Sequence, residues 1–158
     1  MTENYLSVLE ESLQKKLQVM EKIQAYNLRQ EEIFRSEQVE LAKFDEYVEE
    51  KGALIDQLTA LDNGFETLYR KVAEELSENR ERYAEQIRRL QALVTRVTEE
   101  SVAIQAQEAR NKKLIEDYFR RERIHIGQSR RNSKAAYDYY KNMSRAGMNQ
   151  SQFLDNKQ

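Results

Sequence analysis

Between Phe44 and Leu76, the side chains that would face a partner helix recur at alternating steps of four and three residues. The seam positions are Phe44, Val48, Lys51, Ile55, Leu58, Asp62, Phe65, Tyr69, Val72 and Leu76, and Leu54, Leu61 and Leu68 flank them. This spacing is typical of helices that cross at a shallow angle. The flanking leucines widen the seam into a face, so we expect this helix to touch two neighbours. Gly64 is a candidate position for a kink or a break, since glycine costs about 1 kcal/mol in a helix interior.

Two further stretches show a helical rhythm, and the 158 residues include no proline and only four glycines. The first covers about residues 4–34 and carries Leu6, Leu9, Leu13, Leu17, Met20, Ile23 and Leu28. The third carries Tyr83, Ile87, Leu90, Val94, Val97, Ser101, Ile104, Glu108, Asn111, Ile115 and Tyr118, and continues to about residue 126. Polar turns are expected at 35–40 and 77–81.

The predicted fold is all-α: an elongated antiparallel helical bundle, similar to a coiled coil, with long first and third helices. Residues 1–127 would form the bundle domain, and residues 128–158 a basic, tyrosine-rich tail that is partly disordered. A third helix of some forty residues would be about 60 Å long. We therefore expect part of it to project past its partners or to pair with another chain.

Charge is distributed unevenly along the chain. Residues 1–119 hold 17 basic and 25 acidic residues, a net charge of −8, whereas residues 120–145 carry +6. This polarity indicates either an interaction tail or a solvated helix surface. The basic run 120–134, followed by tyrosines, has the residue types that bind nucleic acid, but the acidic chain as a whole (pI about 5.7) argues against that class.

Signals of catalysis are nearly absent from the sequence. His125 is the only histidine and there is no cysteine, so no familiar zinc ligand set exists. Neighbouring acidic residues in a helix point apart, and no glycine-rich phosphate loop is present. We expect no enzyme activity, no catalytic residue, no cofactor and no metal. The sequence also predicts no membrane insertion and no secretory signal, which fits a cytoplasmic protein.

Polar residues interrupt the seam of the third helix at Ser101, Glu108 and Asn111. Either these side chains face solvent beyond shorter partner helices, or this half of the helix awaits a partner. Beyond them lies an apolar strip without an obvious partner inside the chain. It consists of Leu114, Ile115, Tyr118, Phe119, Ile124 and Ile126. Such a strip is typical of helix-in-groove binding or of oligomerisation.

Two segments within these helices give the chain a family resemblance. The runs EEKGALIDQLTAL (Glu49–Leu61) and EARNKKLIEDYF (Glu108–Phe119), between a long first helix and a tyrosine-bearing tail, resemble the FlgN-type flagellar export chaperones. The similarity covers roughly residues 5–143 and lies in helix lengths and short patterns. The tail departs from the family pattern because it is rich in lysine, arginine and tyrosine and lacks short turn elements.

The resemblance implies a cytoplasmic protein that holds flagellar hook–filament junction (hook-associated) proteins and delivers them to the type III export apparatus. It places client binding on the apolar strip and contact with the export gate at tail tyrosines, Tyr137, Tyr139 and Tyr140. Alternatively, the tail folds back as a last helical turn that buries Tyr137 and Tyr140. A competing interpretation is a structural coiled coil or export-stalk protein without a client, whose long helices form a homo-oligomer.

Overall fold

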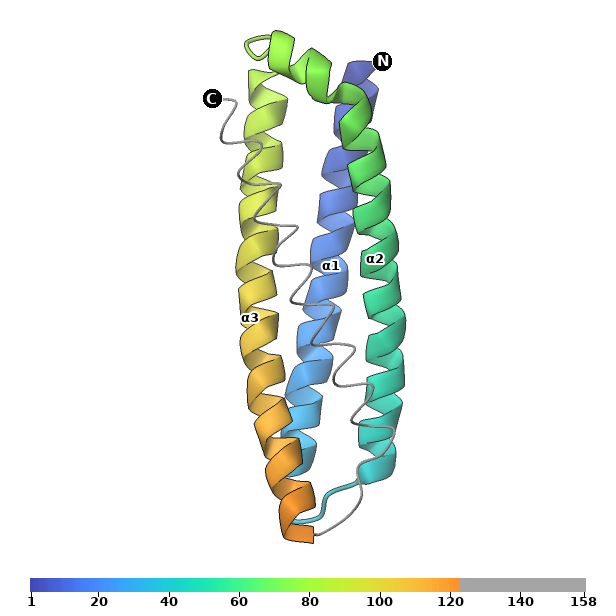
Figure 1. Ribbon diagram of the computed structural model, residues 1–158, viewed down its shortest axis with the longest axis vertical. Coiled ribbons are helices and arrows are strands. Elements are labelled where there is room, and N and C mark those ends of the chain that lie inside the picture. Colours follow the sequence, from blue (N-terminus) through green and yellow to red (C-terminus); the bar gives the residue numbers. More distant parts are fainter. Residues whose placement is uncertain (123–158) are drawn as a thin grey trace.

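The computed structural model describes residues 1–122, which form three long helices and no strand (Figure 1). The helices are α1 (Thr2–Arg35), α2 (Leu41–Glu78) and α3 (Ala84–Glu122). Successive helices run in opposite directions, so α1 and α3 are parallel (Figure 1). The prediction of an all-α helical bundle is confirmed. The predicted boundary between residues 127 and 128 lies outside the described residues.

Helix α1 is the central helix of the bundle. It packs against both α2 and α3, whereas within residues 1–122 the backbones of α2 and α3 do not pair with each other. Figure 1 shows α1 between the other two helices. The second helix touches two neighbours, as expected, but it reaches α3 through side chains alone, as in the ion pair between Lys51 and Glu108. The helix that packs closely on two sides is α1, which presents apolar and amide side chains along most of its buried face.

The three helices have similar lengths of 34, 38 and 39 residues. At 1.5 Å per residue they span about 50–60 Å. Buried side chains on α3 continue from Leu90 to Phe119, so the described part of α3 has partners along its length. The expectation that part of α3 projects past its partners is wrong as far as Phe119, and Arg120–Glu122 are exposed beyond that residue. Pairing with another chain stays a prediction.

Helix α2 runs without a break through Asp62–Gly64. Helical hydrogen bonds and the packing of Leu58 and Phe65 on either side outweigh the unfavourable propensity of glycine. The suggested break at Gly64 is therefore not present.

Replacing Gly64 with alanine should stabilise the bundle. A Cβ atom at this position would meet nothing within 4 Å, so alanine adds no clash. We expect a gain of about 0.5–1 kcal/mol, because alanine is the better helix former and restricts the unfolded chain. Urea unfolding followed by circular dichroism would measure the change. A loss of stability would show that the helix is strained at this point.

Side chains at the helix ends form hydrogen bonds at both ends of the bundle. Ser36 leaves the helical conformation with extended backbone angles (φ −80°, ψ 158°), and its hydroxyl lies 2.8 Å from the Ile33 carbonyl oxygen. At the opposite end, the Glu75 carboxylate accepts hydrogen bonds from the hydroxyls of Thr2 and Tyr83. These bonds hold the pKa of Glu75 below its usual value. Glu75 thus connects the start of α1, the end of α2 and the segment before α3.

Most of the interior is one apolar cluster, which we call the body core. It consists of Leu6, Leu9, Leu13, Leu17, Val19, Met20, Ile23, Leu54, Leu58, Phe65, Val72, Leu76, Tyr83, Leu90, Val94, Val97 and Ile104. A second, smaller group, the end cluster, consists of Phe34, Phe44, Ile115 and Phe119. Leu28, which the sequence pattern placed in the core, is 51% exposed.

None of the helices in residues 1–122 has an apolar stretch of the length that a bilayer span demands.

Candidate functional site

Five buried polar side chains lie between the body core and the end cluster, and we call them the polar layer. They are Asn27 and Gln30 on α1, Lys51 on α2, and Glu108 and Asn111 on α3. Each is at most 8% exposed. The layer therefore crosses all three helices at one level of the bundle.

Lys51 is the centre of this layer. Its ammonium group donates to Asn27 Oδ1 at 2.9 Å, to Gln30 Oε1 at 3.0 Å and to the Glu108 carboxylate. A lysine ammonium carries three hydrogens, so every donor has an acceptor. One side chain of α2 thereby contacts both α1 and α3.

The two asparagines complete the layer between α1 and α3. The Asn111 side-chain amide donates to the backbone carbonyl of Asn27 at 2.8 Å, and the Asn27 amide donates to Gln107 Oε1 at 3.1 Å. The expectation that Glu108 and Asn111 either face solvent or await a partner is wrong. Both already have buried partners inside the chain, because Lys51 and Asn27 lie at the same level.

The separation of α2 and α3 explains why long side chains meet here. Because these two helices do not pair closely, a contact between them requires reach, and Lys51 and Glu108 supply it. Burial lowers the pKa of Lys51, and this effect outweighs the attraction of Glu108. Desolvation disfavours a charged ammonium even when a carboxylate lies beside it.

The lowered pKa of Lys51 predicts a pH-dependent contribution to stability. Between that pKa and the ordinary value of 10.5, the unfolded chain binds more protons than the folded chain, so this group makes stability rise with pH. The unfolding free energy of the wild type minus that of Lys51→Met should therefore increase as the pH approaches 10.5. Denaturant unfolding of both proteins across this range measures the difference, in which other titrating groups cancel. A constant difference would contradict the prediction.

The end cluster lies beyond the polar layer, near the α1–α2 turn. Ile115 and Phe119 of α3 are 8% and 6% exposed and pack with Phe34 and Phe44. The Phe34 and Phe44 rings meet edge to face with centroids 5.0 Å apart, and Tyr118 lies 5.5 Å from Phe34.

The expectation that this apolar strip lacks a partner inside the chain is wrong for its four described residues. Phe34 at the end of α1 and Phe44 at the start of α2 belong to the same cluster as Ile115 and Phe119, and Leu114 and Tyr118 pack against it. Leu114 and Tyr118 remain partly exposed. The other predicted site residues, Ile124, Ile126, Tyr137, Tyr139 and Tyr140, lie outside the described residues.

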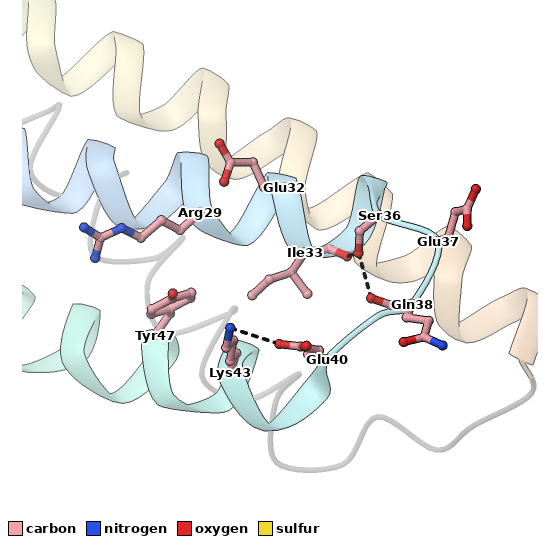
Figure 2. A pocket seen from close by; sticks show the side chains of 9 residues that line it. All are labelled: Arg29, Glu32, Ile33, Ser36, Glu37, Gln38, Glu40, Lys43 and Tyr47. Carbon is pink, nitrogen blue, oxygen red and sulfur yellow. Dashed lines mark hydrogen bonds and ion pairs between the residues drawn. The ribbon is translucent and has the colours of Figure 1, made fainter.

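A pocket of about 510 Å³ opens beside the end cluster, at the α1–α2 turn (Figure 2). Ile33, which packs against the end cluster, lies between the two helices and forms part of its wall. The Arg29 guanidinium lies 5.1 Å from the ring centroid of Tyr26 and 5.8 Å from that of Tyr47. Lys43 pairs with Glu40 at 3.2 Å on the rim. Ile33 and Tyr47 give the pocket apolar and aromatic surface, and its other lining residues are polar or charged.

Sequence reasoning missed the α1 members of the polar layer. The buried positions of α1 continue from Ile23 through Asn27 and Gln30 to Phe34, in steps of four, three and four. Following this rhythm, instead of moving to the apolar Leu28, would have placed both amides in the interior.

Residues 1–122 contain no group of three or more His, Cys, Asp or Glu side chains arranged to hold a metal ion. No family model, no curated protein and no solved structure matches the chain.

Proposed function

We propose that the protein is a cytoplasmic, non-enzymatic export chaperone of the FlgN type that holds hook-associated proteins before export. The proposal rests on the two segments that resemble the FlgN-type chaperones, Glu49–Leu61 and Glu108–Phe119. They are far apart in sequence, yet Lys51 of the first is bonded to Glu108 of the second inside the bundle. Their contact supports reading them as parts of one structural unit.

The surface around the end cluster supports a client site at this end of the bundle. Leu114 and Tyr118 on α3 are partly exposed, and Ile33 and Val48 flank the same cluster from α1 and α2. An amphipathic helix binds such a surface through apolar residues on one face. The charged residues that line the pocket, among them Arg29 and the Glu40–Lys43 pair, suit the polar sides of such a helix. In this proposal, the tail tyrosines at 137, 139 and 140 contact the export gate.

A structural coiled-coil or export-stalk role without a client is the second candidate. One observation favours it: Ile115 and Phe119, two residues of the predicted client strip, are already covered within the chain. A direct binding measurement separates the two candidates.

Binding of C-terminal segments of hook-associated proteins from the same genome tests the proposal, with isothermal titration calorimetry as the measurement. Leu114→Asp should weaken binding by at least about tenfold, or 1.4 kcal/mol, because it places a charge on the docking surface. Ala109→Asp introduces the same charge at an exposed position of α3 and should leave the affinity unchanged. If the wild type binds no such segment, the chaperone role fails and the client-free role remains.

A further inference from the structure

The polar layer divides the interior of the bundle into two separate apolar clusters. On α1 the body core ends at Ile23 and the end cluster begins at Phe34, and on α3 the corresponding residues are Ile104 and Ile115. The buried positions between them on these helices are polar. Apolar packing is therefore interrupted at one level across the bundle.

The two parts of the bundle differ in how firmly they are held. The end cluster has four buried apolar side chains, against seventeen in the body core. Local stability follows the amount of buried apolar contact. The polar layer adds little to the end, because the desolvation of Lys51 and Glu108 offsets much of their attraction.

Opening of the end would also hydrate the buried charges. The side chains of Lys51 and Glu108 are only 6% and 9% exposed, so their return to water compensates part of the lost packing. A second lysine–carboxylate pair, Lys16 and Asp62, lies within the body core at 2.5 Å. Asp62 is already 24% exposed and body-core residues lie on both sides of that pair, so it marks no boundary.

We propose that the end of the bundle, from the polar layer outward, opens as a unit while the body core stays folded, and that the opened end receives an amphipathic helix of the client. This inference rests on the proposed function and deepens it. In the closed end, Leu114 and Tyr118 are available only in part. Opening exposes Ile115 and Phe119 on α3, and it exposes the Phe34 and Phe44 rings that α3 had covered. An incoming helix can cover this apolar surface.

Native-state hydrogen exchange tests the opening without any client. In the wild type, the amides of residues 111–119 should exchange at least about tenfold faster, relative to their intrinsic rates, than those of residues 90–104. The Lys51→Met/Glu108→Leu variant joins the two apolar clusters and should slow exchange at 111–119 by at least about tenfold. The matched Lys16→Met/Asp62→Leu variant should leave exchange at 111–119 unchanged. Ordinary fraying of a helix end would not respond to the pair at 51 and 108.

A second variant acts in the opposite direction and does not depend on repacking. Glu108→Gln leaves Lys51 charged beside neutral acceptors and should speed exchange at 111–119, whereas Asp62→Asn should not. Uniform exchange along α3 in the wild type, or equal responses to both pairs, would overturn the opening.

Client binding is the other part of the test, with the C-terminal segments of hook-associated proteins as the probe. The Lys51→Met/Glu108→Leu variant should bind at least about tenfold more weakly than the wild type, and the Lys16→Met/Asp62→Leu variant equally well. Equal binding by all three proteins would overturn the use of the opened end and leave the proposed function intact. If the wild type itself does not bind, the proposed function fails, and the role of the opened end fails with it; the exchange data then decide on the opening alone.

Discussion

Replacing Glu108 alone with leucine should lower the free energy of unfolding by about 3 kcal/mol, because it leaves the Lys51 ammonium buried without a counter-ion. The three acceptors around Lys51 would fall to two neutral amides. This value is at the bottom of the range expected for breaking a buried ion pair. Local opening of the end cluster would return the Lys51 ammonium to water and so limit the cost. Denaturant unfolding followed by circular dichroism gives the measurement.

The matched double variant separates charge from packing. Lys51→Met combined with Glu108→Leu should return the unfolding free energy to within about 1 kcal/mol of the wild type or above it, because no charge then remains buried. Asp62→Leu is the control at the other pair, and it should have the smaller effect because Asp62 is already partly exposed. If Glu108→Leu and Asp62→Leu were equally mild, the polar layer would contribute nothing specific to the fold.

Leu58→Asp should unfold the bundle. Leu58 is fully buried in the body core, where all three helices contribute side chains. An unpaired carboxylate at this position should cost more than about 4 kcal/mol, a large part of the stability of a domain of this size. Thermal melting followed by circular dichroism should show loss of the cooperative transition.

The neighbouring residue is the control for this substitution. Gln57 is exposed on the same helix, so Gln57→Asp should change stability by no more than about 0.5 kcal/mol. A cooperative transition of Leu58→Asp at the wild-type midpoint would mean that the heptad seam of α2 is assigned to the wrong face.

The helices themselves were predictable because each keeps a regular apolar rhythm. Phe44, Leu58, Phe65 and Val72 lie on the predicted seam of α2 and are buried. On α1, Leu28 was predicted to be buried but is exposed, because it is apolar but lies off the spacing of the buried positions. Periodicity identifies the buried face of a helix, because burial depends on direction around the helix axis as well as on residue type.

The polar layer was only half predictable. The sequence places Lys51, Glu108 and Asn111 on seam positions, but whether they meet depends on how far each helix is shifted along its axis. A shift of one heptad, about 10 Å, would separate Lys51 from Glu108. The same argument applies to the end cluster: an apolar strip on α3 looks unpartnered until the register brings Phe34 and Phe44 against it.

The central position of α1 has a consequence for the order of folding. In the antiparallel α1–α2 pair, contacts begin near the turn and extend from it: Lys51 contacts Asn27 across 24 positions, and Lys16 contacts Asp62 across 46. The parallel α1–α3 pair has no such starting point, since Gln24 meets Glu100 and Asn111 meets Asn27 across 76 and 84 positions.

Closing the larger loop costs about 1 kcal/mol more chain entropy than closing the contact at Lys51. We therefore expect the α1–α2 hairpin to form first and α3 to dock onto it along its whole length. During synthesis, the buried face of α1 would stay half covered until α3 has left the ribosome. The face of α1 that α3 covers is therefore the surface most open to non-native association before the chain is complete.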